Sequence, residues 1–98
     1  MAILETFNKQ PGETRAFDIS FADYLARNNT AARPVDPVQV AVDTGLTLVA
    51  SIWVEEGGYV KLDLSGGQRW RTDKVTAWLY TIGGERLEAD IKVRVKDF

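Results

Sequence analysis

The chain has 98 residues and a formal net charge of −2, with 45% hydrophobic and 27% charged residues. This length provides for one small hydrophobic core, and the composition is that of a folded domain. Cysteine and histidine are both absent, which excludes disulfides and zinc–cysteine sites and removes the most frequent general acid–base and metal ligand. The acidic balance also argues against a nucleic-acid-binding domain.

The N-terminal residues predict an extended arm over 1–12, ahead of a folded domain over 13–98. Ile3, Leu4 and Phe7 are its apolar side chains, and Pro11-Gly12 punctuates its end. The segment lacks the features of a secretory signal, and no apolar run approaches the roughly 20 residues of a membrane helix. Two interpretations stay open: a frayed terminus, or an arm that docks on a neighbouring chain.

Alternating apolar and polar residues predict the first strand of the domain between Glu13 and Phe21, with Phe17 and Ile19 on its inner face. The stretch FADYLA, 21–26, breaks this period and predicts a short helical turn, for which we expect Ser20 to be the cap. A loop follows over 28–37, because its prolines and asparagines oppose regular structure.

The remainder of the chain predicts five further strands separated by turns, most of them rich in glycine. They span approximately 38–42, 46–54, 59–64, 70–82 and 85–95. Six short strands with frequent turns are typical of an all-β protein. We therefore expect a small antiparallel immunoglobulin-like β-sandwich of about six to seven strands.

The strand over 70–82 carries apolar residues on both faces, so the hairpin register at Gly83-Gly84 decides which set joins the core. A two-residue turn would pair Trp78 with Ala89, whereas a three-residue loop ending at Glu85 would pair Leu79 with Ala89. We favour the second register, because Val75, Ala77 and Leu79 suit a thin core. Trp78 and Tyr80 then lie outside.

The strand over 46–54 presents the same ambiguity, with one set of apolar residues at Leu48, Ala50, Ile52 and Val54 and another at Val49 and Trp53. In an immunoglobulin-like sandwich we expect this strand beside the one over 70–82. Trp53, Trp78 and Tyr80 would then share one outer face and form a contact patch. The alternative is that one or more of these aromatic residues lies under the 28–37 loop or in the core.

Residues able to carry chemistry are few. Glu55-Glu56 falls on a hairpin turn, where acids are usually solvated, and the glycines of 65–70 lack the spacing of a phosphate loop. Arg69, Trp70, Arg71 and Lys74 form a basic–aromatic cluster, but Asp73 lies within it and the domain is acidic. We expect no enzymatic activity, no catalytic residue, no metal, no cofactor, and no nucleic-acid or membrane partner.

Five segments in order, MAILETFNKQPGE, FDISFADYL, GLTLVAS, LSGG and GGERLEADIKVRVKD, resemble a family of small tailed-bacteriophage virion proteins of the fibre–tail adaptor type. The resemblance covers nearly the whole chain. It implies an immunoglobulin-like structural protein in several symmetric copies, joining tail or neck to fibre or tailspike. It also implies a place in the virion, after a stay in the host cytoplasm before assembly. The family pattern departs at Asp73, where an aromatic residue is expected, and we expect Trp70 to replace it.

We predict two partner contacts for such a protein. The arm would supply one through Ile3, Leu4 and Phe7, and the outer aromatic residues Trp53, Trp78 and Tyr80 would supply the other. Two alternative functions remain. One is a receptor- or glycan-binding module in which Tyr59 or Trp70 stacks on sugar, and the other is a capsid decoration protein.

Overall fold

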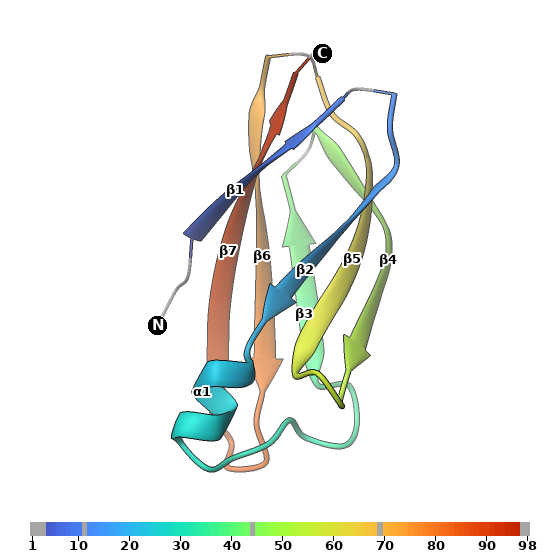
Figure 1. Ribbon diagram of the computed structural model, residues 1–98. Helices are drawn as coiled ribbons and strands as arrows, with labels where there is room; N and C mark the ends of the chain where they lie inside the picture. The colour runs from blue at the N-terminus through green and yellow to red at the C-terminus, as the bar shows by residue number, and fades with distance from the viewer. Residues whose placement is uncertain (1–3, 11, 44, 69, 97–98) are drawn as a thin grey trace.

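Two β-sheets pack face to face in the computed structural model, which describes residues 4–10, 12–43, 45–68 and 70–96 (Figure 1). The described residues form seven strands and one short helix. In chain order they are β1 (Leu4–Lys9), β2 (Arg15–Ser20), α1 (Ala22–Arg27), β3 (Val38–Val42), β4 (Leu46–Val54), β5 (Tyr59–Gly66), β6 (Thr72–Tyr80) and β7 (Arg86–Val95). No helix in this part of the chain is long and apolar enough to cross a membrane.

The larger sheet has the strand order β1-β7-β6-β3 and the smaller one β2-β5-β4. The orders β3-β6-β7 and β2-β5-β4 correspond to the C-F-G and B-E-D strands of immunoglobulin domains. The small all-β sandwich predicted from the sequence is therefore confirmed. One expected neighbour is wrong, since β4 lies in the opposite sheet from β6.

The N-terminal segment also differs from expectation. Residues Leu4–Lys9, predicted as part of an arm, form β1, which pairs in parallel with Asp90–Val95 of β7. Phe7 lies opposite Val93, on the inner face of the sheet, and its ring packs 5.1 Å from that of Phe17. β1 thus closes part of the core, because its inward side chain meets the inner side of the second sheet.

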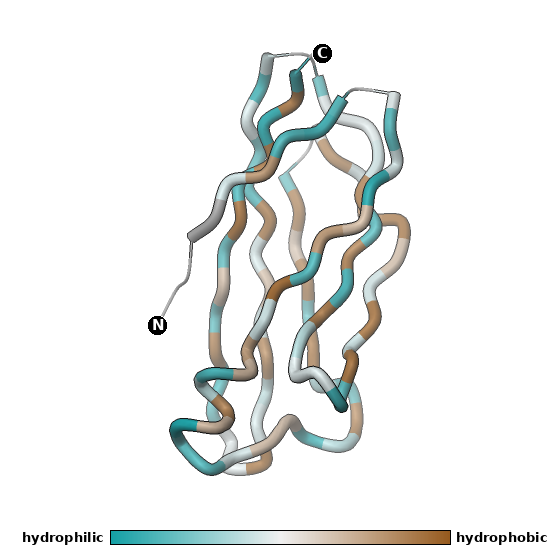
Figure 2. Tube along the Cα trace, in the orientation of Figure 1, coloured by the Kyte–Doolittle hydropathy of each residue, from teal (hydrophilic) through white to brown (hydrophobic). Residues whose placement is uncertain are grey.

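The core lies between the sheets and follows the alternation of the strands, which is visible as brown and teal segments along the chain (Figure 2). On β6 the inward set is Val75, Ala77 and Leu79, as predicted, and all three side chains are fully buried. They share one core with buried residues of β5 and β7: Val60, Leu62, Leu64, Leu87, Ala89, Ile91 and Val93. Removing apolar area of this kind from water is the main stabilising contribution to such a fold.

The β6–β7 hairpin has the predicted inner face, but its register is two residues away from the favoured one. Leu79 pairs with Leu87, not with Ala89. Thr81 is the reason, because it closes the loop: its amide donates to the Glu85 carbonyl at 2.9 Å, and its hydroxyl accepts from the Glu85 amide at 3.2 Å. A shift of two residues keeps every side chain on its face, whereas a shift of one would have reversed them.

β4 changes phase at a bulge between Leu48 and Ala50. Before the bulge Leu48 faces inward opposite Leu64, and after it Trp53 faces inward opposite Val60. The extra residue, Val49, is exposed, and the continuous apolar set predicted for this strand is therefore divided between two faces.

Helix α1 lies at one end of the sandwich, and the following loop crosses that end to reach β3 (Figure 1). The N-cap of α1 is Phe21 and not Ser20, although the Ser20 hydroxyl accepts a bond from the Ala22 amide at 3.3 Å. The loop is tied to the end of β6, where the Arg33 amide donates to the Tyr80 carbonyl at 2.9 Å. This attachment brings a loop arginine beside the outer face of β6.

Candidate partner interface

The outer face of the four-stranded sheet carries a group of aromatic and charged side chains near the α1 end. Two of them, Trp78 and Tyr80, are outward-facing residues of β6. The register places Gln39 of β3 and Glu88 of β7 on either side of Trp78, and Arg86 of β7 opposite Tyr80. We call this group the aromatic patch; it consists of Arg33, Gln39, Trp78, Tyr80, Arg86 and Glu88.

Each aromatic ring of the patch is held by its neighbours. The Trp78 indole Nε1 donates to Glu88 Oε1 at 3.0 Å, and the Arg86 guanidinium lies 5.8 Å from the Trp78 ring centre. The Tyr80 hydroxyl donates to Gln39 Oε1 at 3.0 Å. These contacts fix the rotamers of two half-buried rings, so little side-chain entropy remains to be lost when a partner binds.

Arg33 extends the patch from the loop. Its guanidinium lies 4.2 Å from the Tyr80 ring centre, and Nε and Nη2 donate to the Asp36 carbonyl at 3.0 and 2.8 Å. The same loop and the turn after β6 present two aliphatic side chains, Val35 and Ile82, which are 70% and 65% exposed. Tryptophan, tyrosine and arginine are the residues most enriched in the energetic centres of protein interfaces. The patch is therefore suited to contact rather than to chemistry.

The other predicted interface residues are distributed differently. Trp53 lies in the smaller sheet, faces inward and packs 6.4 Å from the Phe21 ring, while its Nε1 donates to Glu55 Oε2 at 2.6 Å. It does not share a face with Trp78 and Tyr80, because β4 joins the opposite sheet. Phe7 packs inside its own sandwich. The side chain of Leu4 and the whole of Ile3 lie outside the part of the chain that the structure describes.

Sequence reasoning did not connect Arg33, Gln39 or Arg86 with the aromatic residues. Arg33 stands in a loop 45 positions or more before Trp78 in the sequence, and only the contact between loop and β6 brings the two regions together. The sequence contained one indication of these patch residues: alternation in the last strand placed Arg86 and Glu88 on its polar face.

The opposite end of the sandwich buries two charged residues. Lys9 Nζ donates to the Gln10 and Gly66 carbonyls at 2.8 and 2.7 Å, and burial lowers its pKa while the nearby Glu13 carboxylate opposes that shift. Asp73 is also buried, and its Oδ1 accepts from Arg71 Nε at 2.8 Å. Trp70, which we expected to replace an aromatic residue at the Asp73 position, is 70% exposed and precedes β6. These contacts connect strand ends and serve the fold.

Two further arrangements bear on the alternative functions. Tyr59 begins β5 and Trp70 follows its far end, so they do not gather at one set of loop tips as a sugar-stacking site would require. Within the described ranges, no group of three or more acidic residues has the geometry of a metal site. The patch therefore remains the candidate interface.

Comparison with known proteins identifies the chain more directly. A search of curated proteins found no match. The family model described as podophage GP4 fiber-tail adaptor protein gp77 matches residues 9–94, which is most of the chain. This match agrees with the resemblance found in the sequence and with the all-β sandwich. The chain belongs to the podophage GP4 fiber-tail adaptor protein gp77 family, a family of structural phage proteins of the tail.

Proposed function

We propose that the chain is a non-enzymatic assembly protein that links the tail or neck of a podophage to its fibre or tailspike, in several symmetric copies. The observation that supports this role is the aromatic patch, in which Trp78 and Tyr80 are oriented by four neighbouring side chains on a solvent-facing sheet. The family match supports the location in the tail. Before assembly, the chain would reside in the host cytoplasm.

The patch suits a specific and reversible step of assembly. Its rings supply apolar area that is only half covered, and its arginines and Glu88 supply charges at the rim. Rim charges mainly govern the rate and orientation of encounter, whereas buried aromatic side chains contribute most of the affinity. A ring-shaped tail partner would thus be recognised first by charge and then held by Trp78 and Tyr80.

Replacing Trp78 by serine tests this proposal. We expect Trp78→Ser to leave the isolated domain folded, as seen by circular dichroism, and to block its incorporation into particles in a complementation assay. Trp70→Ser is the matched control, because Trp70 is also an exposed tryptophan but lies at the opposite end. Normal incorporation of folded Trp78→Ser would show that the patch is not the interface.

Counting the chain in purified particles separates the adaptor from a decoration protein. Quantitative mass spectrometry should find one or a few copies per portal subunit. A number that follows the major capsid protein would instead identify a decoration protein, and absence from the particle would exclude both structural roles.

A further inference from the structure

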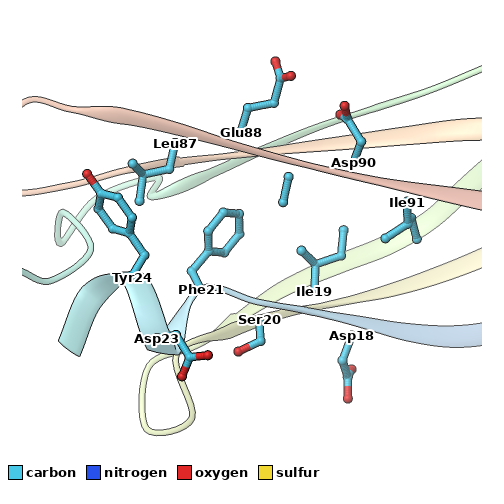
Figure 3. Close-up of a pocket in the computed structure, with 11 residues that line it drawn as sticks. Asp18, Ile19, Ser20, Phe21, Asp23, Tyr24, Leu87, Glu88, Asp90 and Ile91 are labelled. Atoms are coloured by element: carbon cyan, nitrogen blue, oxygen red, sulfur yellow. The ribbon is translucent and has the colours of Figure 1, made fainter. Parts of the chain in front are cut away.

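A second surface lies on the flank of the sandwich, between β2 and β7 (Figure 3). A pocket of about 290 Å³ lies there, lined by β2, the start of α1 and β7. Phe21 and Ile19 of one side face Leu87 and Ile91 of the other, so the interior is apolar. We call this pocket the flank slot. This volume is small for a cofactor but suits a few aliphatic side chains.

The slot coincides with a strand edge that no other described strand covers. β7 pairs with β6 from Arg86 to Arg94, but the described part of β1 pairs only with Asp90–Val95. Among the described residues, no strand covers the other edge of β7 from Arg86 to Ala89. Because Thr81 and Glu85 form a hydrogen-bonded pair, alternation directs the backbone groups of Leu87 and Ala89 toward β6. The N–H and C=O groups of Arg86 and Glu88 therefore point away from β6.

The rim of the slot is acidic. Asp18 and Asp23 point outward on one side, and Glu88 and Asp90 on the other (Figure 3). No lysine or arginine is among the described lining residues. Lys61 stands opposite Asp18 in the β2–β5 pairing, so the charge of the rim rests mainly on the other three carboxylates. Of these, Asp90 has one oxygen, Oδ1, buried without a hydrogen-bond partner among the described residues. An apolar interior between two acidic margins favours a cationic amphipathic occupant.

We propose that the flank slot and the Arg86–Ala89 edge of β7 bind an extended segment of a partner chain by strand addition. Alternate aliphatic side chains of that segment enter the slot, its backbone pairs with Arg86 and Glu88, and its intervening lysine or arginine side chains meet the β7 side of the acidic rim at Glu88 and Asp90. This inference rests on the proposed adaptor role, because an adaptor needs a second contact, and it shares only Glu88 with the aromatic patch.

The probe for this proposal is the peptide Lys-Val-Lys-Val-Lys-Val-Lys with blocked ends, titrated into the full chain at low salt and followed by ¹⁵N NMR. We expect a dissociation constant on the order of 1 mM, with the largest shifts in Arg86–Ala89 and in β2. The Glu88 amide should become protected from exchange. The matching peptide with glutamate in place of lysine should bind about tenfold more weakly, because its charges are repelled.

Two variants of the protein locate the binding. Ala89→Val fills the slot and should weaken binding of the lysine peptide several-fold. Ala77→Val adds the same two methyl groups to the cross-strand neighbour of Ala89, which is a core residue outside the slot lining, and should leave peptide binding unchanged. If Ala89→Val fails to fold, Asp90→Asn provides a second test, since Asp90 lies on the β7 side of the rim, toward which the lysines of an added strand point, and loss of its charge should weaken binding of only the lysine peptide.

Three results would overturn the proposal: no shifts at millimolar peptide, equal binding of the two peptides, or the same shifts on raising protein concentration alone, which would assign the slot to a second copy. Trp78→Ser should still bind the lysine peptide. A failure of the aromatic patch in particle assembly is therefore distinguishable from a failure of the flank slot.

Discussion

The outer faces of the two sheets both carry apolar side chains, yet they differ in how those side chains are held. On the larger sheet Trp78 and Tyr80 are half-buried, and each makes a side-chain hydrogen bond and lies near an arginine. On the smaller sheet the β4 residues Val49 and Ile52 are 57% and 60% exposed.

This difference teaches that exposed apolar area alone does not mark an interface. Scattered aliphatic residues are common on protein surfaces, and Val49 is exposed because a bulge places it there. An ordered aromatic group has a different character, because its orientation has been fixed by neighbouring side chains before a partner arrives. The following predictions test this contrast.

The largest effect is expected beneath the patch. Leu79→Ala removes a fully buried side chain between two patch residues of β6 and should lower the free energy of unfolding by about 2 to 5 kcal/mol. For a domain of this size that corresponds to a fall in Tm of roughly 10 to 30 °C in thermal denaturation. Ile52→Ala on the other face should change stability by less than about 0.5 kcal/mol. Comparable losses for both variants would show that Ile52 is packed in solution.

A smaller loss of stability should distinguish a residue of the aromatic patch from an exposed residue outside it. Glu88→Ala leaves the Trp78 indole without its acceptor and should cost about 1 kcal/mol in urea denaturation. Lys92→Ala is the control, since it is an exposed residue of the same outward row of β7. Equal stability of the two variants would mean that the Trp78–Glu88 bond does not order the ring.

The smallest effect is expected at α1, the helix that precedes the loop carrying Arg33. The Tyr24 hydroxyl donates to Glu85 at 2.9 Å, and this hydrogen bond is the main cause that raises the pKa of Tyr24. The pKa of Tyr24 in the folded protein exceeds the unfolded value of 10.0. The stabilisation that the Tyr24–Glu85 hydrogen bond contributes is therefore present below pH 10 and lost as the pH rises through the folded pKa.

Tyr24→Phe should therefore be slightly less stable than the native chain near neutral pH and approach it in alkali, as measured by urea denaturation across pH 8 to about 12. Tyr59→Phe is the control, since the Tyr59 hydroxyl makes no hydrogen bond to any described residue. Lys9 has a lowered pKa, so its effect on the pH dependence of stability has the opposite sign. It is present in all three proteins, and its effect therefore cancels from the differences between them. A difference between Tyr24→Phe and the native chain that does not change with pH would contradict the assignment.

Much of the fold was predictable because alternation is a local property of a strand. The inner face of β6, the polar and apolar faces of β7 and the extent of β4 all follow from residue order with a period of two. The candidate site was predictable only in part. Trp78 and Tyr80 were placed outside correctly, since Val75, Ala77 and Leu79 fill the core, but Trp53 was assigned to the wrong sheet.

The sequence by itself determined that the segments of β2 to β7 are strands, where the chain turns between them and which side of most strands is apolar. Only the tertiary structure decided which strands are neighbours, how the bulge at Val49 reverses β4, and that Arg33 lies over Tyr80. The physical reason is one of range. Strand formation depends on adjacent residues, whereas sheet order and hairpin register depend on pairings between distant segments.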